Sequence, residues 1–134
     1  VSADVTVDLT GTFADDGELG FVPVPPTRML DTRTGIGGWS PVHGATQTID
    51  ARVAPANAAA VSGTITMVSP MRWGFLQAWG CGAHPPTANV TSLVGDVLAN
   101  SVTTRVSADG RLCIFAHANT GTLFDTTGWW VSTP

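Results

Sequence analysis

Residues 73–79 carry a row of side chains that could bind a ligand. Aromatic residues and a glutamine alternate with small or aliphatic ones: Trp73, Phe75, Gln77 and Trp79 against Gly74, Leu76 and Ala78. On a β-strand the two sets point to opposite faces. With Leu76 and Ala78 in the core, the rings form an exposed row suited to the apolar face and polar rim of a sugar. If the rings face the core instead, the stretch is architectural. Cys81 lies on the same side as the rings, because it continues the alternation of Trp79. Periodicity alone does not choose between these interpretations.

A second candidate is the Arg-x-x-Asp-x-Arg motif of Arg28, Asp31 and Arg33. On a regular strand Asp31 and Arg33 share one face and Arg28 lies on the other, but a turn at Asp31 would bring all three together. Two interpretations stay open. The arginines either pair with the carboxylate and fix the start of the fold, or they hold a sugar hydroxyl or a carboxylate of a ligand.

Loop residues supply two further candidates. Trp39 lies in the Gly-rich stretch 37–40, which predicts an exposed loop residue, and loops often carry function. Asp15, Asp16 and Glu18 could ligate Ca²⁺ together with loop carbonyls, but the EF-hand pattern is absent and the sequence favours a solvated acidic turn. Apart from this calcium option, the sequence predicts no cofactor.

Signals for catalysis are missing. His43, His84 and His117 show no metal-ligand spacing. Neither a serine-nucleophile elbow nor a phosphate-binding loop occurs. No pair of acids is favoured for glycoside hydrolysis, which needs two carboxyl groups across a cleft. We therefore expect a non-enzymatic protein with no catalytic residue.

Composition limits the partners. The 134 residues suit one domain, and the net charge is −4 with six Arg and no Lys. We therefore expect no nucleic acid partner, because binding nucleic acid needs a dense basic patch. No apolar run approaches the length of a membrane span, so we expect no membrane insertion.

Strand-like alternation dominates the elements that would position these residues. Ten short strands are expected, and the turn Asp109-Gly110 between two of them predicts a hairpin. This pattern predicts an all-β fold, namely a two-sheet antiparallel sandwich of jelly-roll type over residues 1–134. The expected strands are 3–10, 20–24, 27–31, 46–53, 60–69, 73–79, 88–93, 99–106, 111–117 and 122–131.

The two cysteines, Cys81 and Cys113, predict one disulfide in an exported protein. Two buried thiols in a cytosolic protein are the alternative. A catalytic thiol is disfavoured, since neither cysteine has a helix N-terminus or a lysine nearby to lower its pKa.

The two ends of the chain resemble each other. Residues 7–13 and 124–130 both follow the pattern apolar-Asp-x-Thr-Gly-x-aromatic, at a domain-length offset. The offset suggests that residues 1–13 are a strand shared with, or left from, a preceding repeat. Two independent strands that meet similar turns are the alternative.

The chain resembles a family of tandem-repeat β domains of secreted actinobacterial proteins, whose signature is "PTRLLDTR … YPCG … DVTGYF". The resemblance covers nearly the whole chain, with local departures, and the family's tyrosines are Phe or Trp here. It implies export, a β-sandwich module and a Cys pair, but no established binding residues. The matching stretches are 26–35, 53–58, 74–76, 79–82, 86–90, 97–100, 109–114 and 125–130.

These observations together predict a secreted or cell-surface, non-catalytic module that binds polysaccharide or cell-wall glycan. The expected binding residues are Trp39, Trp73, Trp79, Gln77, Arg28, Asp31 and Arg33. One alternative is a structural module that assembles with neighbouring copies of the same domain, because an extra terminal strand can pair with a sheet edge. A small glycan-active hydrolase is the third.

Overall fold

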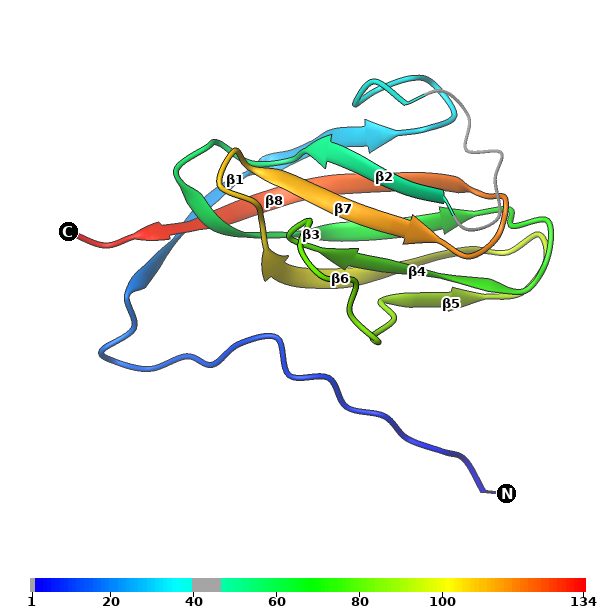
Figure 1. Ribbon diagram of the computed structural model, residues 1–134, viewed down its shortest axis with the longest axis horizontal. Helices are drawn as coiled ribbons and strands as arrows, with labels where there is room; N and C mark the ends of the chain where they lie inside the picture. The colour runs from blue at the N-terminus through cyan, green and yellow to red at the C-terminus, as the bar shows by residue number, and fades with distance from the viewer. Residues whose placement is uncertain (1, 40–46) are drawn as a thin grey trace.

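The computed structural model describes residues 2–39 and 47–134, which form two antiparallel four-stranded sheets packed face to face (Figure 1). The strand order is β1-β8-β3-β6 in one sheet and β2-β7-β4-β5 in the other. The strands are β1 (Leu19–Asp31), β2 (Gln47–Arg52), β3 (Ala58–Val68), β4 (Gly74–Trp79), β5 (Val90–Ser92), β6 (Val97–Arg105), β7 (Arg111–Ala116) and β8 (Gly121–Ser132).

The core lies between the two sheets and follows the alternation in the sequence. In β3, Val61, Ile65 and Met67 are fully buried, whereas the intervening Ser62, Thr64 and Thr66 are half-buried on the outer face. The same period places one set of each strand's side chains inside. The largest of the other fully buried side chains are Phe124, Leu30, Ile49, Leu76, Leu112, Ile114 and Val53.

The described residues form eight strands, not the expected ten. Residues 20–24 and 27–31 belong to the single strand β1, whose pairing with β8 shifts register between Pro23 and Thr27. Pro25 and Pro26 lie in this gap, where their missing N–H groups leave the ladder unpaired while the chain stays extended. An edge strand tolerates this interruption, and β1 is at the edge of its sheet.

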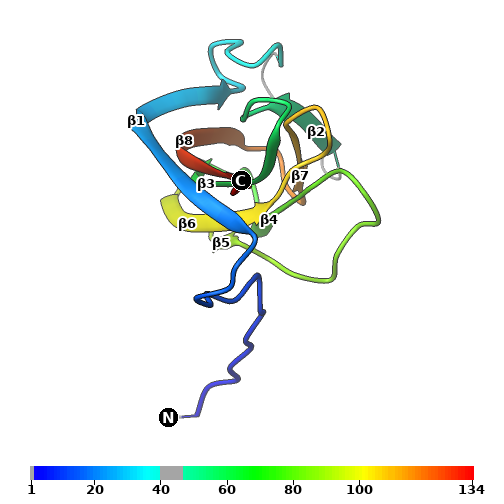
Figure 2. The ribbon, with the colours of Figure 1, turned by 90° about the vertical axis from the view of Figure 1, so that its left-hand side faces the viewer.

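Residues 3–10, the other expected strand, pair with no strand among residues 2–39 and 47–134. Residues 2–18 lie outside both sheets, and Figure 2 shows the blue N-terminal end leaving the sandwich. Their alternating sequence is typical of a strand, but a strand also needs an edge to pair with. No helix long and apolar enough to cross a membrane occurs in the part of the chain that the structure describes.

The Asp109-Gly110 turn is present, but the predicted hairpin is wrong. The Gly110 amide donates to the Ser107 carbonyl at 2.8 Å, and Gly110 has a φ of 80°. The strands on either side, β6 and β7, lie in different sheets, so the turn carries the chain across the sandwich.

The predicted disulfide between Cys81 and Cys113 is confirmed. It joins the loop that follows β4 to the neighbouring strand β7, with the two Cα atoms 4.9 Å apart. The cross-link therefore lies in the sheet that carries residues 73–79.

Candidate functional site

The structure settles which face of residues 73–79 is exposed. Leu76 and Ala78 are buried in the core, so Trp73, Phe75 and Trp79 point away from it. Gly74 also faces inward, where a Cβ would lie 2.7 Å from the Cβ of Ala118. Strand β4 thus packs closely on its inner side and leaves the large rings on the outer one.

Strand β7 pairs with β4 and repeats this arrangement. Leu112, Ile114 and Ala116 are fully buried, whereas Phe115 and His117 point outward and are half-buried. Antiparallel pairing places Phe115 directly opposite Gln77, which brings the outward side chains of the two strands into one layer.

The outward rings form one continuous surface, which we call the aromatic face: Trp73, Phe75, Trp79, His84, Phe115 and His117. At one end Trp73 meets His117, with centroids 5.3 Å apart, and His117 stacks on Phe75 at 4.7 Å.

The surface continues through Phe115. Its ring lies 6.0 Å from that of Phe75 and 4.9 Å from that of His84, and His84 lies 4.7 Å from Trp79 at the far end. Such separations are typical of interacting aromatic pairs. Trp73 is 52% exposed, although it is a large apolar side chain.

Gln77 lies among these residues, but its side chain binds the loop between β4 and β5. It is only 6% exposed, and its Nε2 donates to the carbonyl of Pro85 at 3.1 Å and to that of Thr87. Its Oε1 lies 2.6 Å from Nε2 of His84. The amide therefore holds the loop between β4 and β5 against the sheet and positions His84, with no donor left for a ligand.

The disulfide and Trp79 hold the same loop. Cys81 has a φ of 59°, a conformation that is uncommon for residues other than glycine, and it is bonded to Cys113 of β7. The indole Nε1 of Trp79 donates to the carbonyl of Gly82 at 3.1 Å. Sheet and loop together therefore fix one end of the aromatic face.

Polar side chains border the aromatic face. Thr91 of β5 is opposite Phe75, and Thr48 of β2 is opposite Phe115, so both exposed hydroxyls lie on the outward side. Asp50 follows on β2 and forms an ion pair with Arg111 at 3.0 Å. The arrangement offers flat apolar rings with hydrogen-bonding groups on two sides.

Arg28, Asp31 and Arg33 are brought together, as a turn at Asp31 predicts. The Arg33 guanidinium donates from Nε and Nη2 to the Asp31 carboxylate at 2.9 and 2.8 Å, and Nη1 of Arg28 lies 3.3 Å from it. Arg28 also forms a bidentate pair with Asp125 of β8, at 2.7 and 2.9 Å. We call these four residues the Arg–Asp cluster.

The Arg–Asp cluster directs Nε, Nη1 and Nη2 of Arg28 and Nε and Nη2 of Arg33 to its own carboxylates. Asp31 is 2% exposed and also accepts the backbone N–H of Arg33 at 3.0 Å. The Arg33 guanidinium, by its hydrogen bonds, lowers the pKa of Asp31 to about 2, so the carboxylate stays charged at neutral pH. The cluster links the end of β1 to β8, which is the architectural interpretation of the motif.

Trp39 is not an exposed loop residue. It is half-buried, packs against the core, and donates from Nε1 to the carbonyl of Asp50 at 2.8 Å. Asp15, Asp16 and Glu18 are exposed at a turn, and no group of three or more potential metal ligands occurs among the described residues. His43 lies outside the described residues.

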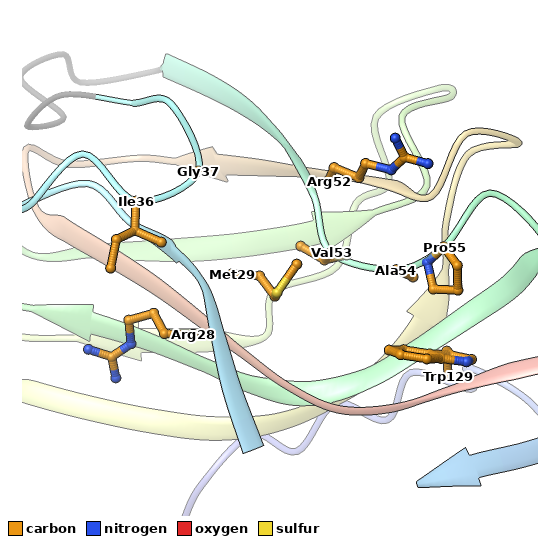
Figure 3. Close-up of a pocket in the computed structure, with 9 residues that line it drawn as sticks. All are labelled: Arg28, Met29, Ile36, Gly37, Arg52, Val53, Ala54, Pro55 and Trp129. Atoms are coloured by element: carbon orange, nitrogen blue, oxygen red, sulfur yellow. The ribbon is translucent and has the colours of Figure 1, made fainter. Parts of the chain in front are cut away.

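A separate apolar groove of about 570 Å³ lies where β1 and β2 approach each other, with Arg28 and Arg52 on opposite sides (Figure 3). It is open to solvent, and its lining contains no carboxylate. The lining residues are Arg28, Met29, Ile36, Gly37, Arg52, Val53, Ala54, Pro55 and Trp129.

Sequence reasoning singled out Trp73 and Trp79 but missed His84, Phe115 and His117 as members of the same surface. A usable signal was present. The predicted Cys81–Cys113 pair makes β4 and β7 neighbours, and the alternation in residues 111–117 then puts Phe115 and His117 beside Phe75.

No protein-family model matches the chain, and a search of curated proteins finds no match either. A sandwich fold serves many functions, so the function depends on the chemistry of the site itself.

Proposed function

We propose that this protein is a secreted, non-catalytic module that binds polysaccharide or cell-wall glycan through the aromatic face. One observation carries the proposal: six rings cover the outer side of β4 and β7 where the second sheet meets solvent. The outer face of an antiparallel sheet is ordinarily polar, and a contiguous apolar patch with a polar border commonly marks a binding surface.

The chemistry of the face suits sugar rings. A pyranose presents C–H groups on its flat sides and hydroxyls around its edge. The rings of Trp73, Phe75 and His117 can take the flat side, while Thr48 and Thr91 are placed to meet the hydroxyls. Aromatic side chains suit this task because they combine a large apolar surface with few rotatable bonds.

Two observations support the remaining parts of the proposal. Asp50, the carboxylate beside the aromatic face, is engaged by Arg111, which favours binding over acid–base chemistry. The disulfide favours an oxidising compartment and hence a secreted or cell-surface location.

We also infer that the sandwich is of jelly-roll type. The pairings β1–β8, β2–β7, β3–β6 and β4–β5 support this, because they are the nested pairs of one long hairpin rolled into two sheets. Jelly rolls contain eight strands in two such sheets.

The experiment is a binding screen of the intact chain against insoluble polysaccharides and isolated cell-wall fractions, followed by isothermal titration with the fraction that is retained. The test variant is Trp73→Ala, which removes the most exposed ring of the face. We expect it to weaken binding about tenfold, or about 1.4 kcal/mol, because single aromatic anchors carry this much at binding surfaces.

The matched control is Trp130→Ala. Trp130 lies on the outer side of the opposite sheet, where Nε1 donates to Oγ of Ser62 at 2.9 Å. This variant is expected to bind like the unaltered chain. Retention on no fraction, or equal weakening by both substitutions, contradicts the proposal.

A further inference from the structure

Residues 4–13 have the sequence of a strand but pair with none of the strands that the structure describes. Their apolar side chains are almost fully exposed: Val5 at 84%, Val7 at 88%, Leu9 at 83% and Phe13 at 87%. Phe13 contacts the ring of Trp130 at 5.5 Å, and residues 8–10 border an open pocket beside β4 and β6, but the segment joins neither sheet. Figure 2 shows the blue N-terminal end leaving the sandwich. Single exposed apolar residues are ordinary, whereas an alternating series of them is not.

Residues 4–13 repeat the side chains through which β8 contacts its two neighbouring strands, β1 and β3. In β8, Asp125 binds Arg28 of β1 through two hydrogen bonds of 2.7 and 2.9 Å. Thr127 donates from its hydroxyl to the carbonyl of Ser62 in β3 at 3.1 Å. Aligned on their common pattern, the segment has Asp8 and Thr10 at these two positions.

The match extends to a position where only glycine fits. A Cβ on Gly128 would lie 2.3 Å from Cζ of Phe21, whose ring crosses β8 and packs on Trp130 at 4.9 Å. The segment has Gly11 in place of Gly128 and Phe13 in place of Trp130. In the present chain nothing lies within 4 Å of a Cβ built on Gly11, so its own surroundings do not call for a glycine.

The side of the segment that would face a core also carries apolar residues. On the side of β8 that alternates with Asp125 and Thr127, Thr122, Phe124 and Thr126 are buried, and they correspond to Val5, Val7 and Leu9. Apolar residues thus occupy the three places that face the core, and the same alternation points Asp8 and Thr10 outward as in β8.

We propose that residues 4–13 are the closing strand of a second domain of this fold, filling between its β1 and β3 the place that β8 fills here. Asp8 would bind Arg28 of that domain, and Gly11 would lie under its Phe21. The partner is a second copy of the sandwich that lacks its own β8. The aromatic face is in the other sheet, so this inference is independent of glycan binding.

The test is a tandem chain in which residues 14–117 are followed directly by the full chain 1–134. The upstream unit then lacks β8 and receives residues 1–13 at the matching distance from its β7. We expect hydrogen exchange at residues 4–13 to slow by at least tenfold relative to the single chain, and titration to detect no free thiol because both units form their disulfide.

The matched variant is Gly11→Val. In the single chain it leaves the melting temperature unchanged, because the space around Gly11 is open. In the tandem chain it clashes with Phe21 of the upstream unit and abolishes the protection of residues 4–13.

A second tandem, in which the upstream unit keeps its own β8 (residues 14–134 before 1–134), shows that linked units fold. The proposal is wrong if residues 4–13 exchange equally fast in the first tandem and in the single chain while this control folds. Protection that survives Gly11→Val is equally contradictory, since it would mean that the segment docks elsewhere.

Discussion

The Arg–Asp cluster and the aromatic face are both surface features that the sequence marks as candidate ligand sites, yet they differ in what their side chains contact. In the cluster, the donors of Arg28 and Arg33 are aimed at carboxylates of the same protein. On the aromatic face, Trp73 is half exposed and the rings contact one another beneath open solvent. Residues of types that often bind ligands therefore indicate a site only where their hydrogen-bonding groups or ring surfaces are not engaged by other residues of the protein.

This comparison separates stability from binding. Substitutions in the cluster should reduce the free energy of unfolding and leave glycan affinity intact. Substitutions on the aromatic face should reduce glycan affinity and leave the free energy of unfolding intact. Each of the following changes can break that separation.

Removal of the disulfide by Cys81→Ser with Cys113→Ser should have the largest effect. The bond closes a loop with a sequence separation of 32, and its loss should reduce the free energy of unfolding by about 3–4 kcal/mol in the chain-entropy model. Affinity should fall as well, because the loop that carries His84 is released from the sheet. Urea unfolding and calorimetric titration measure the two effects; unchanged affinity would show that this loop is not part of the binding surface.

Asp31→Asn comes next. The substitution removes a buried charge between two arginines, and we expect the free energy of unfolding to fall by about 2–3 kcal/mol, below the usual cost of breaking a fully buried pair because both arginines are partly exposed. Asp125→Asn is the matched control with a smaller loss, since its carboxylate is more exposed than that of Asp31. A parallel loss of glycan affinity at a temperature where the variant is folded would make the cluster part of the site.

Acid should reproduce the effect of this substitution in the unaltered chain. The pKa of Asp31 is lowered from 3.8 to about 2 by folding, so its contribution is complete above pH 5 and is lost as the pH falls toward 2. The corresponding loss is about 2 kcal/mol. Unfolding followed from pH 6 to 2 measures it, and the Asp31→Asn variant should lack this part of the pH dependence. An equally steep profile in the variant would assign the effect to other carboxyl groups.

Local patterns predicted much of this molecule because the underlying physics is local. Alternation indicated the all-β class, the cysteine pair indicated the disulfide, and a turn at Asp31 brought Arg28 and Arg33 to one carboxylate. The predictions that were wrong depended on pairing partners distant in the sequence. Residues 3–10 alternate like a strand, but no sheet edge in the described part of the chain pairs with them. The turn at Asp109-Gly110 joins two sheets instead of two paired strands.

The aromatic face could not be assigned from residues 73–79 alone. Apolar residues occupy both sides of β4, and only the packing of Leu76 and Ala78 against the other sheet decides which side is outside. The polar His117, which pairing places beside Phe75, is the residue that distinguishes the outward side. For Trp39 the prediction was wrong. Its glycine-rich loop suggested exposure, but the indole packs against the core and donates to the carbonyl of Asp50.

Glycan binding on the aromatic face is tested most directly by the indole N–H signals of the five tryptophans. In a nitrogen–proton NMR titration with the retained glycan, the Trp73 signal should shift, together with the backbone amides of β4 and β7. The signals of Trp129, which lines the apolar groove, and of Trp130 on the opposite sheet should stay unchanged. A stationary Trp73 signal, with shifts instead at Trp129 or at the guanidinium groups of Arg28 and Arg33, would contradict the account.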